Sequence, residues 1–340
     1  MHKHASARHY TTRAIEALKK QVAHLSSIGD AHTAQDVKRT LGWLEQAVVF
    51  ALPDGGRLLD NMRPLSLDDI DILHLPYPIV ALEYHVGESN RGNTIGEVVQ
   101  TISTPRRIAL CIDFTGEQAE QFCPTVLNSS NACPVGTEGG VMVTAVCEST
   151  DSNMPGWFAS SIGAVISRDQ SGRGNPTLPP GLGIDEKDVY QATPNPVSFA
   201  MEPLVHSVAS AAIMRYGHDR AMAYAYADLI DELNAASSFI QAMACTNIVT
   251  ERVPANHRLN KKRVKNGKIP YSDYHVLKIR LSGSKAESAR SAYGDRRTPR
   301  EHLRRGHIRR LADGRRIWVN PCVVAAGSKG KAHKSYRVAL

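Results

Sequence analysis

Two runs of β-branched and apolar residues decide the fold: Pro78–His85 reads PIVALEYH and Arg106–Phe114 reads RRIALCIDF. Val141–Val146 and Trp157–Ile166 continue the pattern, and sequences rich in Gly, Asn and Pro separate the four runs. No helical periodicity lies between consecutive runs. We therefore expect residues 76–166 to form a mostly antiparallel sheet in which successive strands are neighbours.

Helical patterns flank this β-rich stretch on both sides. Apolar residues recur at helical spacing in two successive groups, first Ile15, Leu18, Val22 and Leu25 and then Val37, Leu41, Leu44 and Val48. The short connection between the groups predicts an antiparallel helical hairpin over residues 11–52. A Gly- and Pro-rich connection spans residues 167–197, and residues 203–244 are predicted to be helical with an interruption near Tyr216-Gly217.

The charged residues are distributed very unevenly along the chain. Residues 249–340 hold 24 Lys and Arg against 6 Asp and Glu, a net charge of +18, whereas residues 1–248 hold 17 against 27, a net charge of −10. We expect an acidic α+β body over residues 1–248 and a small basic β module over residues 249–340. A segment this basic indicates a polyanionic partner, and the alternative is neutralisation of the two parts across an internal interface.

The basic segment contains an alternating run, His275–Leu281 (HVLKIRL). Leu277, Ile279 and Leu281 are expected on one face of a strand, with Val276, Lys278 and Arg280 on the other. A strand with one apolar and one largely cationic face is typical of a sheet whose exposed side meets phosphate.

A second signal in this segment is Asp313-Gly314, which lies between two β-prone runs and predicts a hairpin. Arg309 and Arg310 would then lie across the turn from Arg315 and Arg316. Four like charges so close together repel one another, and a bound polyanion would remove that penalty.

These observations predict an intracellular nucleic-acid-binding protein. The arginine-rich composition, with histidines and a nearby tryptophan, suits bidentate phosphate contacts and base stacking. No recognition helix is apparent, so single-stranded nucleic acid or structured RNA is the expected partner rather than a specific duplex site. The residues expected to bind are Lys278, Arg280, Arg304, Arg305, Arg309, Arg310, Arg315 and Arg316, with Trp318 for stacking.

The run Thr298–Arg310 (TPREHLRRGHIRR), closed by Gly314–Asn320 (GRRIWVN), resembles a motif near the C-terminus of poorly characterised proteins of tailed bacteriophages and prophages. Leu75–Glu83 (LPYPIVALE) is loosely similar to the segment that leads into a strand in the same group of proteins. The resemblance covers about 35 residues. It implies a phage-encoded protein acting in the cytoplasm of an infected bacterium, and it carries no established activity.

Two alternative functions fit the same residues. His302 and His307 flank a pair of arginines and would act as general base and general acid in a metal-independent nuclease. Residues five apart on a regular strand project to opposite faces, so His302 and His307 could serve one site only if the strand bends at Gly306. The third possibility is an interaction protein that binds an acidic host factor through the basic face.

Other classes of function lack support in the sequence. Apolar residues make up 42% and charged residues 22%, which excludes wholesale disorder. Neither a secretory signal nor a membrane span is recognisable, and we expect no cofactor. Cys123, Cys133 and Cys147 lack the short paired spacing of a zinc site, so we expect no metal and interpret them as buried free thiols. Asp68, Asp69 and Asp71 are interpreted as a helix start or turn.

Overall fold

A computed structural model describes residues 8–58, 65–86, 94–95, 98–99, 104–128, 138–151, 155–170, 197, 199–280, 302–304, 307–319 and 322–324. Its centre is one sheet built from β1 (Val48–Ala51), β2 (Ile79–His85), β5 (Arg106–Phe114), β6 (Gly140–Ser149), β7 (Gly156–Ser167), β8 (Ala200–Pro203), β9 (Ile248–Val253) and β10 (Tyr274–Ile279). The strand order is β8-β7-β6-β5-β2-β1-β10-β9. β1 runs parallel to both β2 and β10, and the other neighbours are antiparallel.

The meander expected over residues 76–166 is confirmed. β2, β5, β6 and β7 follow one another in the chain and pair antiparallel as neighbours. A short ladder of β3 (Thr94–Ile95) and β4 (Val98–Val99) lies in the chain between β2 and β5.

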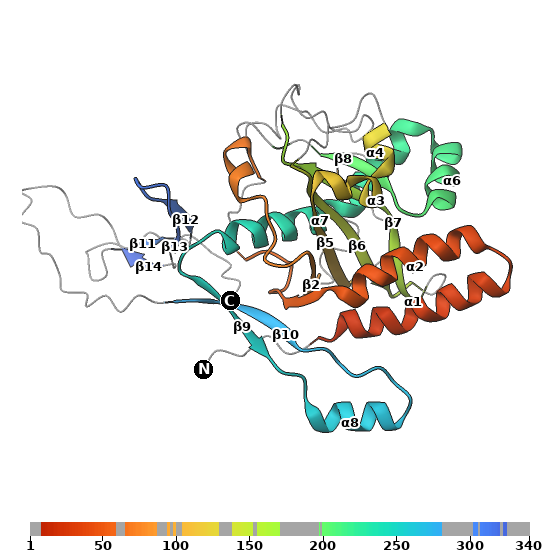
Figure 1. Cartoon of the computed structure of the whole chain (residues 1–340). Coiled ribbons are helices and arrows are strands. Elements are labelled where there is room, and N and C mark those ends of the chain that lie inside the picture. The colour runs from red at the N-terminus through yellow and green to blue at the C-terminus, as the bar shows by residue number, and fades with distance from the viewer. Residues whose placement is uncertain are drawn as a thin grey trace, which may run out of the picture.

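Helices cover both faces of the sheet (Figure 1). α1 (Tyr10–Ser27) and α2 (Ala31–Gln46) pack on one face, and α7 (His218–Met243) packs on the other. Shorter helices lie around them: η1 (Leu67–Ile72), η3 (Gly116–Gln118), α3 (Ala119–Phe122), α4 (Pro124–Asn128) and α6 (His206–Tyr216). No helix in the described part of the chain is both long and apolar enough to cross a membrane.

The two helical layers explain why the strands read as nearly continuous apolar runs. Along β2, Ala81 belongs to the core under α1 and α2, whereas Val80 and Leu82 belong to the core under α7. Successive side chains of a strand point to opposite faces, so a sheet covered on both sides needs apolar residues at both. The fold is thus α+β, with a mixed and mostly antiparallel sheet, which confirms the fold class predicted from the sequence.

The N-terminal helix pair is confirmed, but its C-terminal boundary is corrected. The prediction extended the hairpin to residue 52, whereas α2 ends at Gln46 and Val48–Ala51 forms β1. Val48 fits the helical spacing of the preceding residues, but it begins a β-prone run that pairs with Val80 of β2 and continues to Phe50 beside β10. Tertiary pairing overrides the local pattern here. The helices predicted over 203–244 are confirmed, with Gly217 separating α6 from α7.

The sheet continues across residue 248, where the boundary of a basic module was expected. β9 and β10 belong to the same sheet as the acidic body. The expectation of one cationic strand face is also corrected, because Val276 packs against the core under α1 and α2 while Leu277 packs against the core under α7. In the chain, α8 (His257–Lys265) connects β9 to β10, and it extends beyond the body (Figure 1). We call residues 248–280 the arm.

Two small ladders follow the arm in the chain. β11 (His302–Arg304) pairs with β14 (Cys322–Val324), and β12 (His307–Arg310) pairs with β13 (Arg316–Val319). The second ladder confirms the hairpin predicted at Asp313-Gly314, with Gly314 at a φ of 84°. We call residues 307–319 the C-terminal hairpin. The Gly- and Pro-rich connection lies mostly outside the described residues.

A buried ion pair fastens α7 to the sheet. The Nε of Arg107 on β5 lies 2.6 Å from Oε1 of Glu232 on α7, and both side chains are almost completely buried. The Tyr84 hydroxyl donates to the same Oε1 at 2.6 Å, and the Arg107 guanidinium also donates to the Thr104 hydroxyl at 2.7 Å. The Arg107 guanidinium therefore donates to both Glu232 and Thr104.

We expect Glu232→Gln to lower the free energy of unfolding by about 3 to 5 kcal/mol, because it leaves the Arg107 charge buried without its counter-ion. Glu45→Gln is the matched control, since Glu45 pairs with Lys19 on the surface and its loss should cost under about 1 kcal/mol. Urea unfolding of both variants measures the difference. Equal losses would contradict the role given to Glu232.

Candidate nucleic-acid interface

The C-terminal hairpin presents fewer free cations than its sequence suggests. Arg309 and Arg310 are exposed and make no ion pair within the described residues. Arg315 is also exposed, but its guanidinium lies 2.7 Å from Oδ2 of Asp313 in the same turn. That pairing lowers the pKa of the Asp313 carboxyl.

Arg316 is buried against the body, which corrects the expectation that it contacts phosphate. Its guanidinium lies 3.2 Å from carboxylate oxygens of both Asp69 and Asp71 and donates to the Asp68 carbonyl at 3.0 Å. These acids lie on η1, whose start is fixed by a capping box between Ser66 and Asp69, so their interpretation as a helix start is confirmed. At this position the structure shows the alternative considered from the sequence, neutralisation across an internal interface.

Burial of Arg316 also resolves the expected repulsion within the hairpin. Arg310 lies directly opposite Arg316 in the ladder. Because Asp69 and Asp71 neutralise the Arg316 charge, Arg310 faces a compensated neighbour.

Trp318 fixes the hairpin through its backbone. Its N–H donates to Oδ1 of Asn247 at 2.7 Å, and its carbonyl accepts from Nδ2 of the same side chain at 2.7 Å. The indole is half-buried, and its N–H has no hydrogen-bond partner in the described part of the structure.

The remaining predicted binding residues are placed as follows. Lys278 on β10 pairs with Glu251 on β9, and Arg280 is exposed with no ion pair among the described residues. Arg304 lies on β11, and Arg305 and Gly306 lie outside the described residues.

The two histidines proposed for catalysis lie on different ladders. His302 is on β11, which pairs with β14, and His307 is on β12, which pairs with β13. In its ladder His307 lies opposite Val319 and is half-buried. The bend that would bring the two imidazoles together falls at positions the structure does not describe.

A group of exposed cations at the tip of the arm is not among the binding residues predicted from the sequence. Residues 257–268 contain six Lys and Arg and no Asp or Glu. Of these, Arg258, Lys261, Lys262, Lys265 and Lys268 are exposed, and none has an ion pair within the described ranges. An N-cap Asn256 before a run free of Gly and Pro was the available signal for a helix here.

The opposite side of α8 is held firmly against the body. The Arg263 guanidinium lies 2.6 Å from the Glu16 carboxylate on α1 and 3.9 Å above the Tyr271 ring. The other face of that ring stacks on His9 with 3.8 Å between centroids. The Asn260 side chain exchanges two hydrogen bonds with the Tyr271 backbone, at 2.8 and 2.9 Å.

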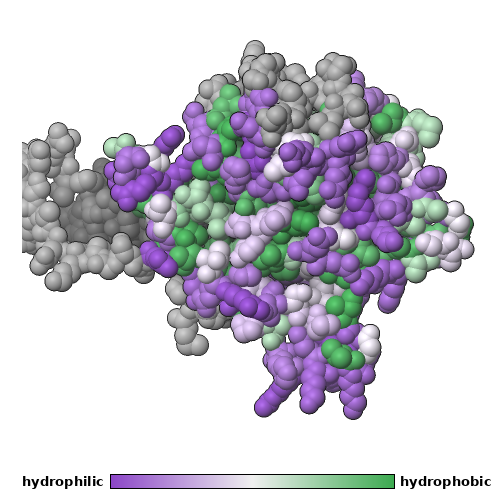
Figure 2. Space-filling model, viewed as in Figure 1, coloured by the Kyte–Doolittle hydropathy of each residue, from purple (hydrophilic) through white to green (hydrophobic). Residues whose placement is uncertain are grey.

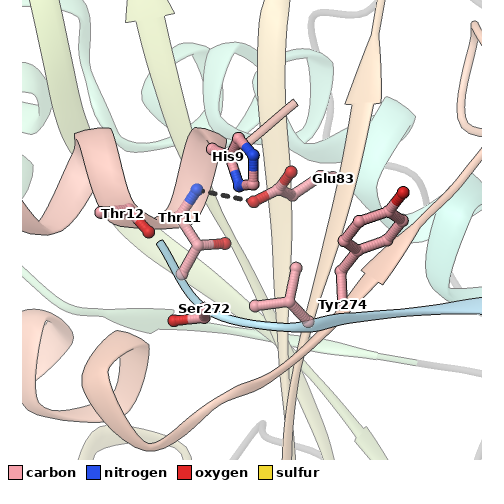
Figure 3. Close-up of a pocket in the computed structure, with 7 residues that line it drawn as sticks. His9, Thr11, Thr12, Glu83, Ser272 and Tyr274 are labelled. Atoms are coloured by element: carbon pink, nitrogen blue, oxygen red, sulfur yellow. Dashed lines mark hydrogen bonds between the residues drawn. The ribbon is translucent and has the colours of Figure 1, made fainter. Parts of the chain in front are cut away.

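A small cavity lies where the arm joins the body (Figure 3). It is lined by His9, Thr11, Thr12, Val49, Glu83, Ser272 and Tyr274, and its volume is about 10 Å³. A cavity of that size holds about one water molecule, so it is too small for an organic substrate.

Glu83 is an almost completely buried carboxyl in the lining of the cavity. Burial raises the pKa of the Glu83 carboxyl, although the Thr11 N–H donates to Oε1 at 2.7 Å and opposes that effect. In Figure 3 the carboxyl points toward the first turn of α1. Glu83 therefore caps the N-terminus of this helix.

The thiols and metal-ligating residues give no second site. Cys111, Cys147 and Cys245 are buried free thiols, which confirms the interpretation of Cys147. Cys123 is buried, and Cys133 lies outside the described residues. Burial raises the pKa of Cys245 to about 11, so this thiol is protonated at neutral pH. Within the described ranges no group of three or more His, Cys, Asp or Glu is placed to hold a metal ion.

Comparisons with protein-family models, with curated proteins and with solved structures give no match to this chain.

We expect Arg316→Ala to detach the C-terminal hairpin from η1, because it leaves the buried Asp69 carboxylate without its cation. Unfolding free energy should fall by about 3 kcal/mol, and hydrogen exchange of the β12 and β13 amides should accelerate. Arg315→Ala is the control and should change neither, since Arg315 pairs only within the exposed turn. Unchanged exchange in Arg316→Ala would refute the docking role.

We expect Glu83→Gln to stabilise the fold at neutral pH. A carboxyl whose pKa is higher in the folded chain than its unfolded value of about 4.3 destabilises the fold as pH rises above that value. The gain should therefore be present at pH 7 and disappear below about pH 4, where the carboxyl is protonated in both states. Urea unfolding across this range tests the prediction, and parallel pH profiles of the two proteins would contradict it.

Proposed function

We propose that this chain is a nucleic-acid-binding protein whose phosphate-binding surface lies on the arm and the C-terminal hairpin. The observation that carries the proposal is a set of exposed cations in these two segments that have no ion pair in the described part of the chain: Arg258, Lys261, Lys262, Lys265, Lys268, Arg280, Arg309 and Arg310.

The distribution of paired and unpaired cations supports this proposal over general solubility. The body neutralises two cations of the C-terminal part, Arg316 through η1 and Arg263 through Glu16. Those two hold the segments in place, and the eight exposed cations remain available for a ligand. A surface with so much unbalanced positive charge attracts phosphates at long range and accelerates encounter.

In this proposal Arg309 and Arg310 make phosphate contacts at the hairpin. Trp318 and the Arg304-Arg305 pair remain candidates from the sequence, while Arg316 acts as a positioning residue. The resemblance to phage and prophage proteins adds the expectation that the nucleic acid is encountered inside an infected bacterium.

The binding test uses the full chain, because β9 and β10 complete the sheet and truncation at residue 248 would remove them. Affinity for nucleic acid should fall linearly on a log–log plot against salt concentration, with a slope of about −0.9 for each duplex phosphate neutralised. Arg309→Ala with Arg310→Ala should make the slope less steep by up to about 1.8.

Arg215→Ala with Arg220→Ala is the matched control. These two arginines are exposed on α6 and α7, on the side of the molecule away from the hairpin (Figure 1), so their loss should leave the slope unchanged. A wild-type salt slope near zero would refute the proposal. An equal change of slope in the hairpin and control variants would show that the effect comes from net charge alone.

A further inference from the structure

The cations of α8 form one continuous stripe. Arg258, Lys261, Lys262 and Lys265 occupy positions i, i+3, i+4 and i+7 and are all exposed. At 3.6 residues per turn they fall within an arc of about 100° and extend over about 10 Å of helix. We call these four residues the lysine stripe.

The lysine stripe faces directly away from the protein. Asn260 and Arg263, which fasten the helix to the 269–271 segment and to Glu16, each lie about 150° around the helix from the centre of the stripe. Figure 2 shows the tip of the arm as a hydrophilic projection clear of the body. A bulky partner can therefore reach the stripe without meeting the rest of the fold.

We propose that the lysine stripe binds the phosphate backbones of double-stranded B-form DNA, with α8 laid into the major groove. This inference rests on the proposed function and assigns to it both a surface and a class of ligand. It differs from the sequence-based expectation of a single-stranded partner, which depended on the absence of a recognisable helix.

The dimensions of α8 favour a B-form duplex. A helix with its side chains is about 10 to 12 Å across, and the major groove of B-form DNA is about 12 Å wide and about 8.5 Å deep. An A-form RNA helix has a narrow major groove that does not admit a helix. Nine residues give α8 a length of about 13.5 Å, so it lies along the groove for less than half a turn of the duplex, with its long cationic side chains directed to the phosphates that flank the groove.

The chemistry of the arm disfavours a single strand. Single-stranded sites combine cations with exposed aromatic rings on which bases stack. The tyrosine ring that packs on α8, Tyr271, is covered by His9 on one face and Arg263 on the other. The stripe therefore suits contacts to the phosphate backbone, because three of its four residues are lysines, which act as compact point charges.

The apolar residues of α8 disfavour a lipid surface. Leu259 and Val264 are 42% and 60% exposed, but they lie about 140° apart around the helix. A helix that binds a bilayer presents a continuous apolar face for insertion, which these two residues do not form.

The test compares binding of the full chain to duplex DNA, the same sequence as single strand, the corresponding RNA duplex and anionic phospholipid vesicles. We expect the duplex DNA to bind most tightly and independently of its sequence. The variant R258A/K261A/K262A/K265A should weaken that binding by at least about 100-fold and make the salt slope less steep by about 3 to 4. Alanine favours helix, so α8 should remain folded, which circular dichroism and urea unfolding check.

Two controls separate the stripe from net charge and from the hairpin. K20A/K38A/R215A/R220A removes four exposed cations elsewhere and should change affinity by less than about threefold. L259A/V264A should leave DNA binding unchanged.

The inference fails alone if the stripe variant binds DNA like the wild type while R309A/R310A does not, since the proposed function then stands on the hairpin. It also fails if single strands or the RNA duplex bind as tightly as duplex DNA, or if binding is confined to vesicles and lost in L259A/V264A. If the wild type binds no nucleic acid in any form, the proposed function fails with it.

Discussion

The parallel pairing of β10 with β1 is the contact on which the arrangement of the basic segment depends. It brings residues more than two hundred positions apart into register, with His275 opposite Phe50. Because β10 is anchored between β1 and β9, the arm is continuous with the central sheet. The Arg263–Glu16 pair and the stacked ring of Tyr271 then fix α8 relative to α1. The exposed cations are therefore presented on a rigid support.

Electrostatics divides the basic residues into two kinds. Arg316 and Arg263 form ion pairs with carboxylates of the body. Arg316 attaches the C-terminal hairpin to the body in this way, and Arg263 attaches α8. The exposed lysines of α8 make no ion pair with any carboxylate in the part of the chain that the structure describes. The basic residues of the C-terminal part thus have two fates. Some are buried in ion pairs that attach a segment to the body, and others stay exposed to solvent; burial of the individual guanidinium or ammonium group distinguishes the two.

The sequence predicted the parts of the fold that local pattern controls. The meander from β2 to β7, the helix pair, the break at Gly217 and the turn at Gly314 each follow from periodicity or turn chemistry over a few residues. The pattern failed where distant partners decide. Val48–Ala51 became a strand because β2 and β10 flank it, and Val276 turned inward because α1 and α2 cover that face. The burial of Arg316 depends on η1, which is far away in the chain, so no local signal could predict it.

The parallel β1–β10 contact also has a consequence for synthesis of the chain on the ribosome. Until the codons for residues 274–279 have been translated, β1 is paired only with β2 and presents an open edge of main-chain N–H and C=O groups. The acidic body is thus translated completely before the strand that covers the edge of β1, so the central sheet cannot close until late in synthesis.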